Sequence, residues 1–126
     1  MSVQYHLVQR GNPAKPEDPK KFYASAQSRG EITLRELSKE IAEISTVSVV
    51  DTTAVIESLL QLIPRHVTNG HIVRLADFGS FNVRIDSEAS DTEETFKNSL
   101  INGVNLYFRP GKELQKALEN VKFEKV

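Results

Sequence analysis

The chain has 126 residues and a net charge of −1, which suits one domain whose small core a partner subunit can complete. It contains no cysteine, so disulfides and thiolate metal sites are excluded. The slightly negative total argues mildly against a strong nucleic-acid binder, although the distribution of charge along the chain matters more than its sum.

The first ten residues lack a basic start followed by an apolar run, so we expect no signal peptide. No apolar stretch approaches the roughly 18 residues that cross a bilayer. We therefore expect a soluble, cytoplasmic protein without a membrane partner.

The N-terminal segment has the pattern of two strands. Residues 3–10 alternate between apolar and polar side chains, the period of a half-buried strand. Residues 11–19 contain three prolines and predict a loop, after which residues 20–27 can return as a second strand. The pattern predicts a β-hairpin extension over residues 1–30, followed by a second domain over residues 31–126.

Two helices are predicted next. Thr33 and Glu36 form a capping box, and apolar residues at spacings of three and four continue the helix to about Ser45. Ser48, with Asp51 three residues later, predicts the start of the second helix.

The second helix carries a wide apolar stripe, so we expect it to be covered on more than one side. Pro64 removes one backbone hydrogen bond and predicts a kink or an end. Asn69 and Gly70 form a C-terminal stop signal.

Strands are predicted beyond that stop. Residues 71–76 form a short strand and residues 77–79 a turn. Residues 80–85 and 104–108 alternate, so each of these strands has one apolar and one polar face.

The C-terminal region predicts one more helix. Pro110 suits its first position, and apolar residues recur between 114 and 121. Residues 123–126 are predicted as a tail. Helices in one run and antiparallel strands in another indicate an α+β fold.

Two motifs carry a resemblance to a known family: Leu75-Ala-Asp-Phe-Gly-Ser-Phe-Asn-Val-Arg84 and Leu106-Tyr-Phe-Arg-Pro-Gly-Lys112. With the two helices before them, residues 32–122 resemble the HU/IHF family of bacterial histone-like, DNA-bending proteins. The whole chain resembles a longer HU-like branch with an N-terminal extension, found in Bacteroides-type bacteria.

The resemblance implies an HU/IHF-like fold. This fold has a two-helix body, a three-stranded antiparallel sheet and a short C-terminal helix, here with an added N-terminal β-hairpin. It also implies an intertwined homodimer whose two sheets form a saddle for duplex DNA. Phe78, Phe81 and Phe108 fall where the family places core aromatics, and alternation along the strands agrees with that packing role.

The DNA-binding candidates combine strand arginines, a helix start and a turn. Arg84 and Arg109 alternate onto the polar strand faces and match basic positions of the family's saddle. Lys and Arg side chains bind DNA by neutralising phosphates, without sequence preference, and a helix N-terminus favours anions. The predicted DNA-binding residues are Arg74, Gly79, Ser80, Arg84, Arg109, Gly111 and Lys112, with Gly111 and Lys112 as a phosphate cradle. The alternative is that the arginines are merely solvated.

The chain departs from the family between residues 86 and 98. The family's arm is basic and carries an Arg-Asn-Pro segment whose proline wedges between base steps. Here the segment has five acids, one lysine and no proline. Residues 92–95 can start a short helix, with Phe96 and Leu100 turned inward.

Two functions remain open. The first is a sequence-tolerant, architectural DNA-binding homodimer associated with the nucleoid. The second is an HU-fold interaction or structural protein that has lost most duplex binding through its acidic segment.

The extension contains four basic residues, which either add a basic surface or are solvated: Lys15, Lys20, Lys21 and Arg29. We expect no enzyme, cofactor, metal or small-molecule substrate, because the three histidines have no ligand spacing.

Overall fold

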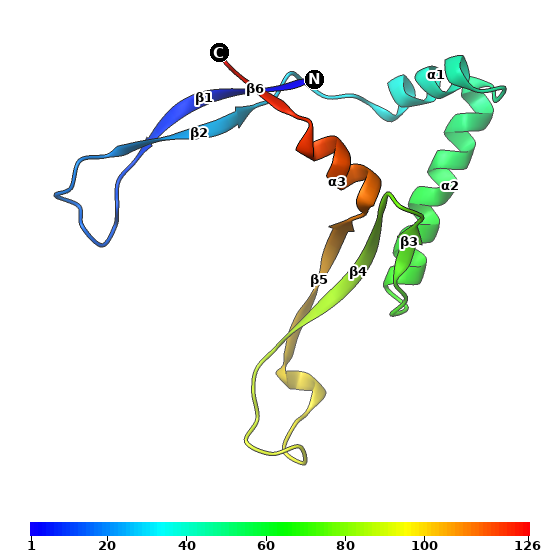
Figure 1. Cartoon of the computed structure of the whole chain (residues 1–126). Helices are drawn as coiled ribbons and strands as arrows, with labels where there is room; N and C mark the ends of the chain where they lie inside the picture. Colours follow the sequence, from blue (N-terminus) through cyan, green and yellow to red (C-terminus); the bar gives the residue numbers. More distant parts are fainter. The chain divides into compact units, whose positions relative to one another are not determined.

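The computed structural model describes residues 1–126, and the chain is an α+β protein, as predicted (Figure 1). None of its helices is both long and apolar enough to cross a membrane. The elements follow one another in the order β1 Ser2–Arg10, β2 Lys21–Gln27, α1 Leu34–Ile44, α2 Val49–Val67, β3 Val73–Leu75, β4 Gly79–Ser87, η1 Asn98–Leu100 (a 3₁₀ helix), β5 Ile101–Pro110, α3 Lys112–Glu119 and β6 Lys122–Lys125.

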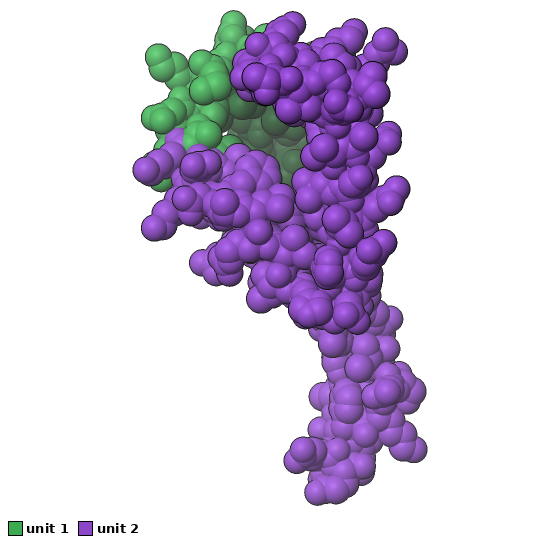
Figure 2. Space-filling view, turned by 90° about the vertical axis from the view of Figure 1, so that its right-hand side faces the viewer, with its two compact units in different colours: residues 1–33, 117–126 green, residues 34–116 purple.

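The chain divides into two compact units (Figure 2). Unit 1 combines residues 1–33 with residues 117–126, and unit 2 comprises residues 34–116. The C-terminal residues therefore belong to the same unit as the N-terminal extension.

Unit 1 contains a three-stranded sheet in the order β2-β1-β6. β1 and β2 pair antiparallel, which confirms the predicted hairpin. β6 pairs parallel with β1, from Ser2 opposite Lys122 to Tyr5 opposite Lys125. The predicted tail is therefore wrong, because residues 122–125 form a strand. Its partner lies at the other end of the sequence, and four residues are too few to show a strand period.

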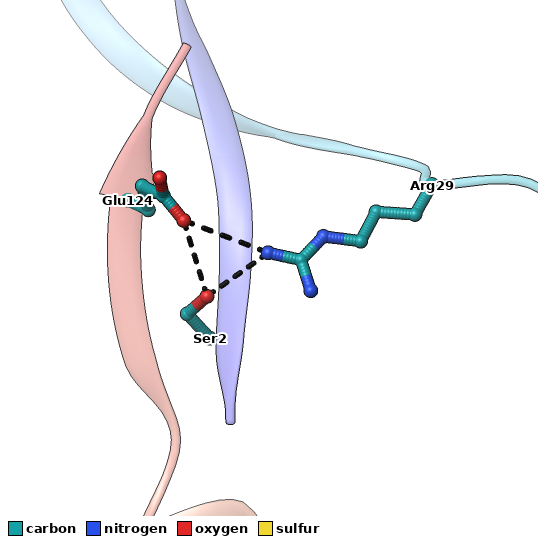
Figure 3. A network of polar contacts seen from close by, with 3 residues as sticks. All are labelled: Ser2, Arg29 and Glu124. Carbon is teal, nitrogen blue, oxygen red and sulfur yellow. Dashed lines mark hydrogen bonds and ion pairs between the residues drawn. The ribbon is translucent and has the colours of Figure 1, made fainter.

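A polar network in unit 1 links β1, β6 and the segment that follows β2 (Figure 3). Arg29 Nη2 donates to Ser2 Oγ at 3.0 Å, and Ser2 Oγ donates to Glu124 Oε2 at 3.3 Å. Arg29 and Glu124 also form an ion pair at 3.6 Å. Both charged side chains are exposed, so we expect this pair to stabilise the sheet by at most about 1 kcal/mol.

The helices of unit 2 begin where the sequence predicts. α1 follows Thr33 directly. At α2, Ser48 Oγ accepts a hydrogen bond from the Asp51 backbone N–H at 3.1 Å, which satisfies one of the free donors at a helix start.

α2 continues through Pro64 to Val67, so of the predicted kink or end at Pro64 the end does not occur. Pro64 lies in the last turn and removes only one intrahelical bond. Its carbonyl still accepts from the Thr68 backbone N–H at 2.9 Å and from Thr68 Oγ1 at 2.7 Å. Gly70, with φ of +89°, provides the predicted stop.

Unit 2 also contains an antiparallel sheet in the order β3-β4-β5. The turn between β3 and β4 lies one residue earlier than predicted, since Ala76 adopts a φ of +48° and Gly79 already belongs to β4. Pro110 is the last residue of β5, and α3 begins only at Lys112, so the prediction of Pro110 at the first helical position is wrong. Gly111 precedes the helix, and its carbonyl accepts from the Gln115 N–H at 3.0 Å.

The core of the isolated chain is small. Val67, 3% exposed, is its only buried hydrophobic residue. The three aromatics predicted to pack do contact one another, with ring centroids of Phe108 at 5.8 Å from Phe78 and 4.8 Å from Phe81. Phe78 nevertheless remains 46% exposed, and Leu60 in the apolar stripe of α2 is 56% exposed. The chain alone thus leaves much of its apolar surface uncovered.

Candidate functional site

The sheet of unit 2 gathers polar side chains on one face. Residues directly opposite each other in an antiparallel pair project on the same side. Ser80 on β4 lies opposite both Arg74 on β3 and Arg109 on β5, so these three form a row across the sheet. Three further rows follow along β4 and β5, the last of them Asp86 opposite Gly103; Figure 1 shows these two strands. We call this the polar face, and its members are Arg74, Ser80, Asn82, Arg84, Asp86, Asn105, Tyr107 and Arg109.

The opposite face of the same sheet is apolar. Phe81 lies opposite Phe108, and Val83 lies opposite Leu106. Because side chains alternate along each strand, packing of the aromatics on this side directs the arginines to the other. The sequence period therefore placed the predicted strand arginines correctly on one shared face.

The arginines of the polar face, and Lys112 at the start of α3 beside it, form no ion pair. Arg74, Arg84, Arg109 and Lys112 are all exposed, and no carboxylate lies within ion-pair distance of their side chains. Unneutralised cations on one surface raise the local concentration of anions. The polar face therefore carries three arginines against one carboxylate, Asp86, and this excess of positive charge favours anions.

Two shallow depressions contain all seven predicted residues. One, of about 410 Å³, includes Gly79, Gly111 and Lys112 in its wall. The other, of about 240 Å³, includes Arg84 and Tyr107. Both share the row Arg74, Ser80 and Arg109. The predicted residues thus lie together on a continuous open surface.

Gly111 has a packing role in this site. Its N–H donates to the Phe78 carbonyl at 2.8 Å, and the Glu113 N–H donates to the Asp77 carbonyl at 3.2 Å. These two donors are used within the protein, so neither of them is free for a phosphate at the start of α3. A Cβ at Gly111 would overlap the Asp77 carbonyl oxygen and lie 2.6 Å from the carbonyl carbon.

Gly79 is constrained in a similar way. It is buried in β4, between β3 and β5. A Cβ there would lie 2.6 Å from the Phe108 ring and 2.7 Å from the Arg109 carbonyl oxygen. Close approach of the strand backbones therefore accounts for the glycine at this position.

Sequence reasoning missed Tyr107. The Cζ atom of Arg84 lies 3.6 Å from the centroid of the Tyr107 ring, which is a cation–π contact. Alternation along β5 predicted that Tyr107 lies on the same side as Arg109, and nothing else in the sequence indicated that Tyr107 belongs to the site. The pairing with Arg84 depends on the register between β4 and β5, which the sequence does not state.

The acidic segment after β4 differs from its prediction. Residues 93–95 form a turn in which the Phe96 N–H bonds to the Glu93 carbonyl at 3.3 Å, so the short helix expected there is absent. The Thr92 and Thr95 hydroxyls bond to each other at 3.0 Å, and such local bonds compete with helix formation. Phe96 is 39% exposed and so is not turned inward, whereas Leu100 is half-buried. The carboxylates of this segment form no ion pair.

The chain is similar to one protein family and to two solved structures. The model of one family, HU-HIG, described as an HU domain fused to wHTH, Ig, or glycine-rich motif, matches residues 1–125. A candidate bacterial DNA-binding protein from Bacteroides vulgatus ATCC 8482 has a similar structure, with a TM-score of 0.67 and 13% identity over 99% of this chain. The match covers only 48% of that chain, so this sequence spans about half its length.

HU from Anabaena, solved in a cocrystal with DNA, also matches, with a TM-score of 0.56 and 23% identity. This match covers 71% of the present chain and 99% of the Anabaena chain. No curated protein matches. The predicted HU-like fold, with helices, a three-stranded antiparallel sheet and extra N-terminal strands, is confirmed.

Proposed function

The chain belongs to the HU-HIG family of HU domains, and from this premise we propose that it is an architectural, sequence-tolerant DNA-binding protein that acts as a homodimer. The proposal assigns DNA binding to residues 31–126 and treats residues 1–30 as an extension. It includes a cytoplasmic, nucleoid-associated location. It includes no catalytic activity, cofactor or small-molecule substrate.

The polar face is the observation that carries this proposal. Three exposed arginines lie on the polar face, Lys112 lines the same depression as Arg74 and Arg109, and none of the four forms an ion pair. Such cations bind a polyanion by displacing its condensed counterions, which gives affinity without base readout. The similarity to an HU protein solved with DNA supports the same ligand.

Exposed apolar surface supports the homodimer. The chain has an accessible surface of 10871 Å², against about 6,700 Å² expected of a compact monomer of 14.1 kDa. The excess is roughly 4,000 Å² for one chain, whereas an obligate homodimer buries about 2,000–5,000 Å² in total, half of it on each subunit, so the excess is large enough to supply one subunit's share. Exposed apolar side chains on α2, such as Val55 and Leu60, would be covered by a second copy.

The second candidate function remains an interaction or structural protein with weak duplex binding. The acidic segment favours it, because unpaired carboxylates repel phosphates. Asp86 still belongs to β4, but residues 88–98 follow the last paired residues of β4 and β5, Ser87 and Ile101, at the end of the sheet away from Arg109. We therefore favour DNA binding by the polar face, with affinity reduced by the acidic segment.

Binding of the full chain to two unrelated duplexes at low salt tests the proposal. We expect similar affinity for both sequences, and a large loss with Arg84→Ala/Arg109→Ala. The charge-matched control Lys20→Ala/Lys21→Ala, in the extension, should bind nearly as the unmodified chain does. Absence of measurable binding by the unmodified chain would favour the second function. A loss confined to the Lys20/Lys21 variant would move the contact to the extension.

A further inference from the structure

The polar face contains one arginine whose side chain is held in place. Arg84 on β4 is paired with Asn105 on β5, but its guanidinium lies over the ring of Tyr107, two residues further along β5. The distance of 3.6 Å from Cζ to the ring centroid is van der Waals contact. Both side chains are exposed, and Tyr107 retains 40% of its accessible surface.

The carboxylate that follows Arg84 on the same face of β4 has another partner. Asp86 projects from the same face of β4, two residues beyond Arg84. Its Oδ2 accepts a hydrogen bond of 2.6 Å from Asn105 Nδ2. Asn105 thereby engages one oxygen of the Asp86 carboxylate, and Arg84 packs on the aromatic ring and forms no ion pair.

We propose that Tyr107 is a positioning residue, which holds the Arg84 guanidinium on the polar face for contact with a backbone phosphate of DNA. The inference rests on the proposed function. An aromatic ring has no hydrogen-bond acceptor at its face that competes with phosphate, so the N–H groups that do not face the ring remain free to donate. Holding the side chain before binding removes part of the entropy that it would otherwise lose on contact.

Two variants of Tyr107 test the ring itself. We expect Tyr107→Leu to weaken binding to a duplex. Each subunit should contribute a factor of about 2 to 10, because its Arg84 side chain is then mobile before binding and loses more entropy on contact. Tyr107→Phe retains the ring and should bind within about 2-fold of the unmodified chain. Equal loss in both variants would overturn the inference, because the hydroxyl, not the ring, would then be the active group.

A double-mutant cycle links the effect to Arg84. In an Arg84→Ala background, Tyr107→Leu should cause no further loss of affinity, since there is no guanidinium left to hold. Additive losses would overturn the inference and assign Tyr107 its own contact with DNA. The proposed function is judged separately, by binding of the unmodified chain. If that chain binds and Tyr107→Leu binds equally well, only the positioning role is wrong.

Discussion

Replacing Gly111 by alanine separates a packing role from a phosphate-binding role at the start of α3. The added Cβ would overlap the Asp77 carbonyl oxygen and lie 3.0 Å from the carbonyl carbon of Phe78. Both neighbours are backbone atoms, so neither can move away by rotating a side chain. Relief of the overlap would also separate the Gly111 N–H from the Phe78 carbonyl, which it now bonds at 2.8 Å.

The expected cost combines two effects. Overpacking of a tight site costs about 1–3 kcal/mol, and loss of one backbone hydrogen bond costs about 1 kcal/mol more. We therefore expect Gly111→Ala to lower the free energy of unfolding by about 2–4 kcal/mol. Gly103→Ala is the matched control, because a Cβ there has no neighbour within 4 Å. It should be neutral or stabilising by up to about 1 kcal/mol.

Urea unfolding at one fixed protein concentration measures both variants, since the stability of a dimer depends on concentration. The packing account predicts a lower midpoint for Gly111→Ala alone. Unchanged stability of Gly111→Ala together with a loss of DNA affinity would refute it and return Gly111 to the phosphate cradle.

Three further changes probe other parts of the molecule. Glu93→Gln/Glu94→Gln should raise DNA affinity about 2- to 5-fold at low salt by removing repulsion, and an unchanged affinity would show that the segment lies away from the duplex. Leu60→Asp should lower the solution mass from that of a dimer to that of a monomer, measured by light scattering, whereas Gln61→Asp should leave it unchanged. Asn105→Ala should release Asp86 to pair with Arg84 and weaken DNA binding, and an affinity equal to that of the unmodified chain would contradict this.

Local patterns predicted much of unit 2. Ser48 with Asp51 marked the start of α2, because capping depends on residues three apart in the sequence. The alternation of β4 and β5 put the arginines and the aromatics on opposite faces, because side chains in a strand have a period of two. The resemblance to the HU/IHF family added the positions of the candidate DNA contacts.

Features that depend on distant partners were not predictable. β6 pairs with β1 from the other end of the chain, and its four residues carry no strand signal of their own. The contact of Arg84 with Tyr107 depends on the register of two strands separated by the acidic segment. Proline is a residue type that suits a helix start, yet Pro110 ends β5. The N–H groups of Gly111 and Glu113 bond to carbonyls in the turn between β3 and β4, and these bonds fix where α3 begins.

The salt dependence of DNA affinity tests the central claim most directly, namely that unpaired cations of the polar face bind phosphates. Arg84→Ala/Arg109→Ala removes four arginines from a homodimer. Each phosphate contact contributes about 0.9 to the slope of log affinity against log salt, so the slope should become shallower by roughly 3 to 4. An equal slope in the variant and the unmodified chain, both still folded and dimeric, would contradict the assignment of DNA binding to this face.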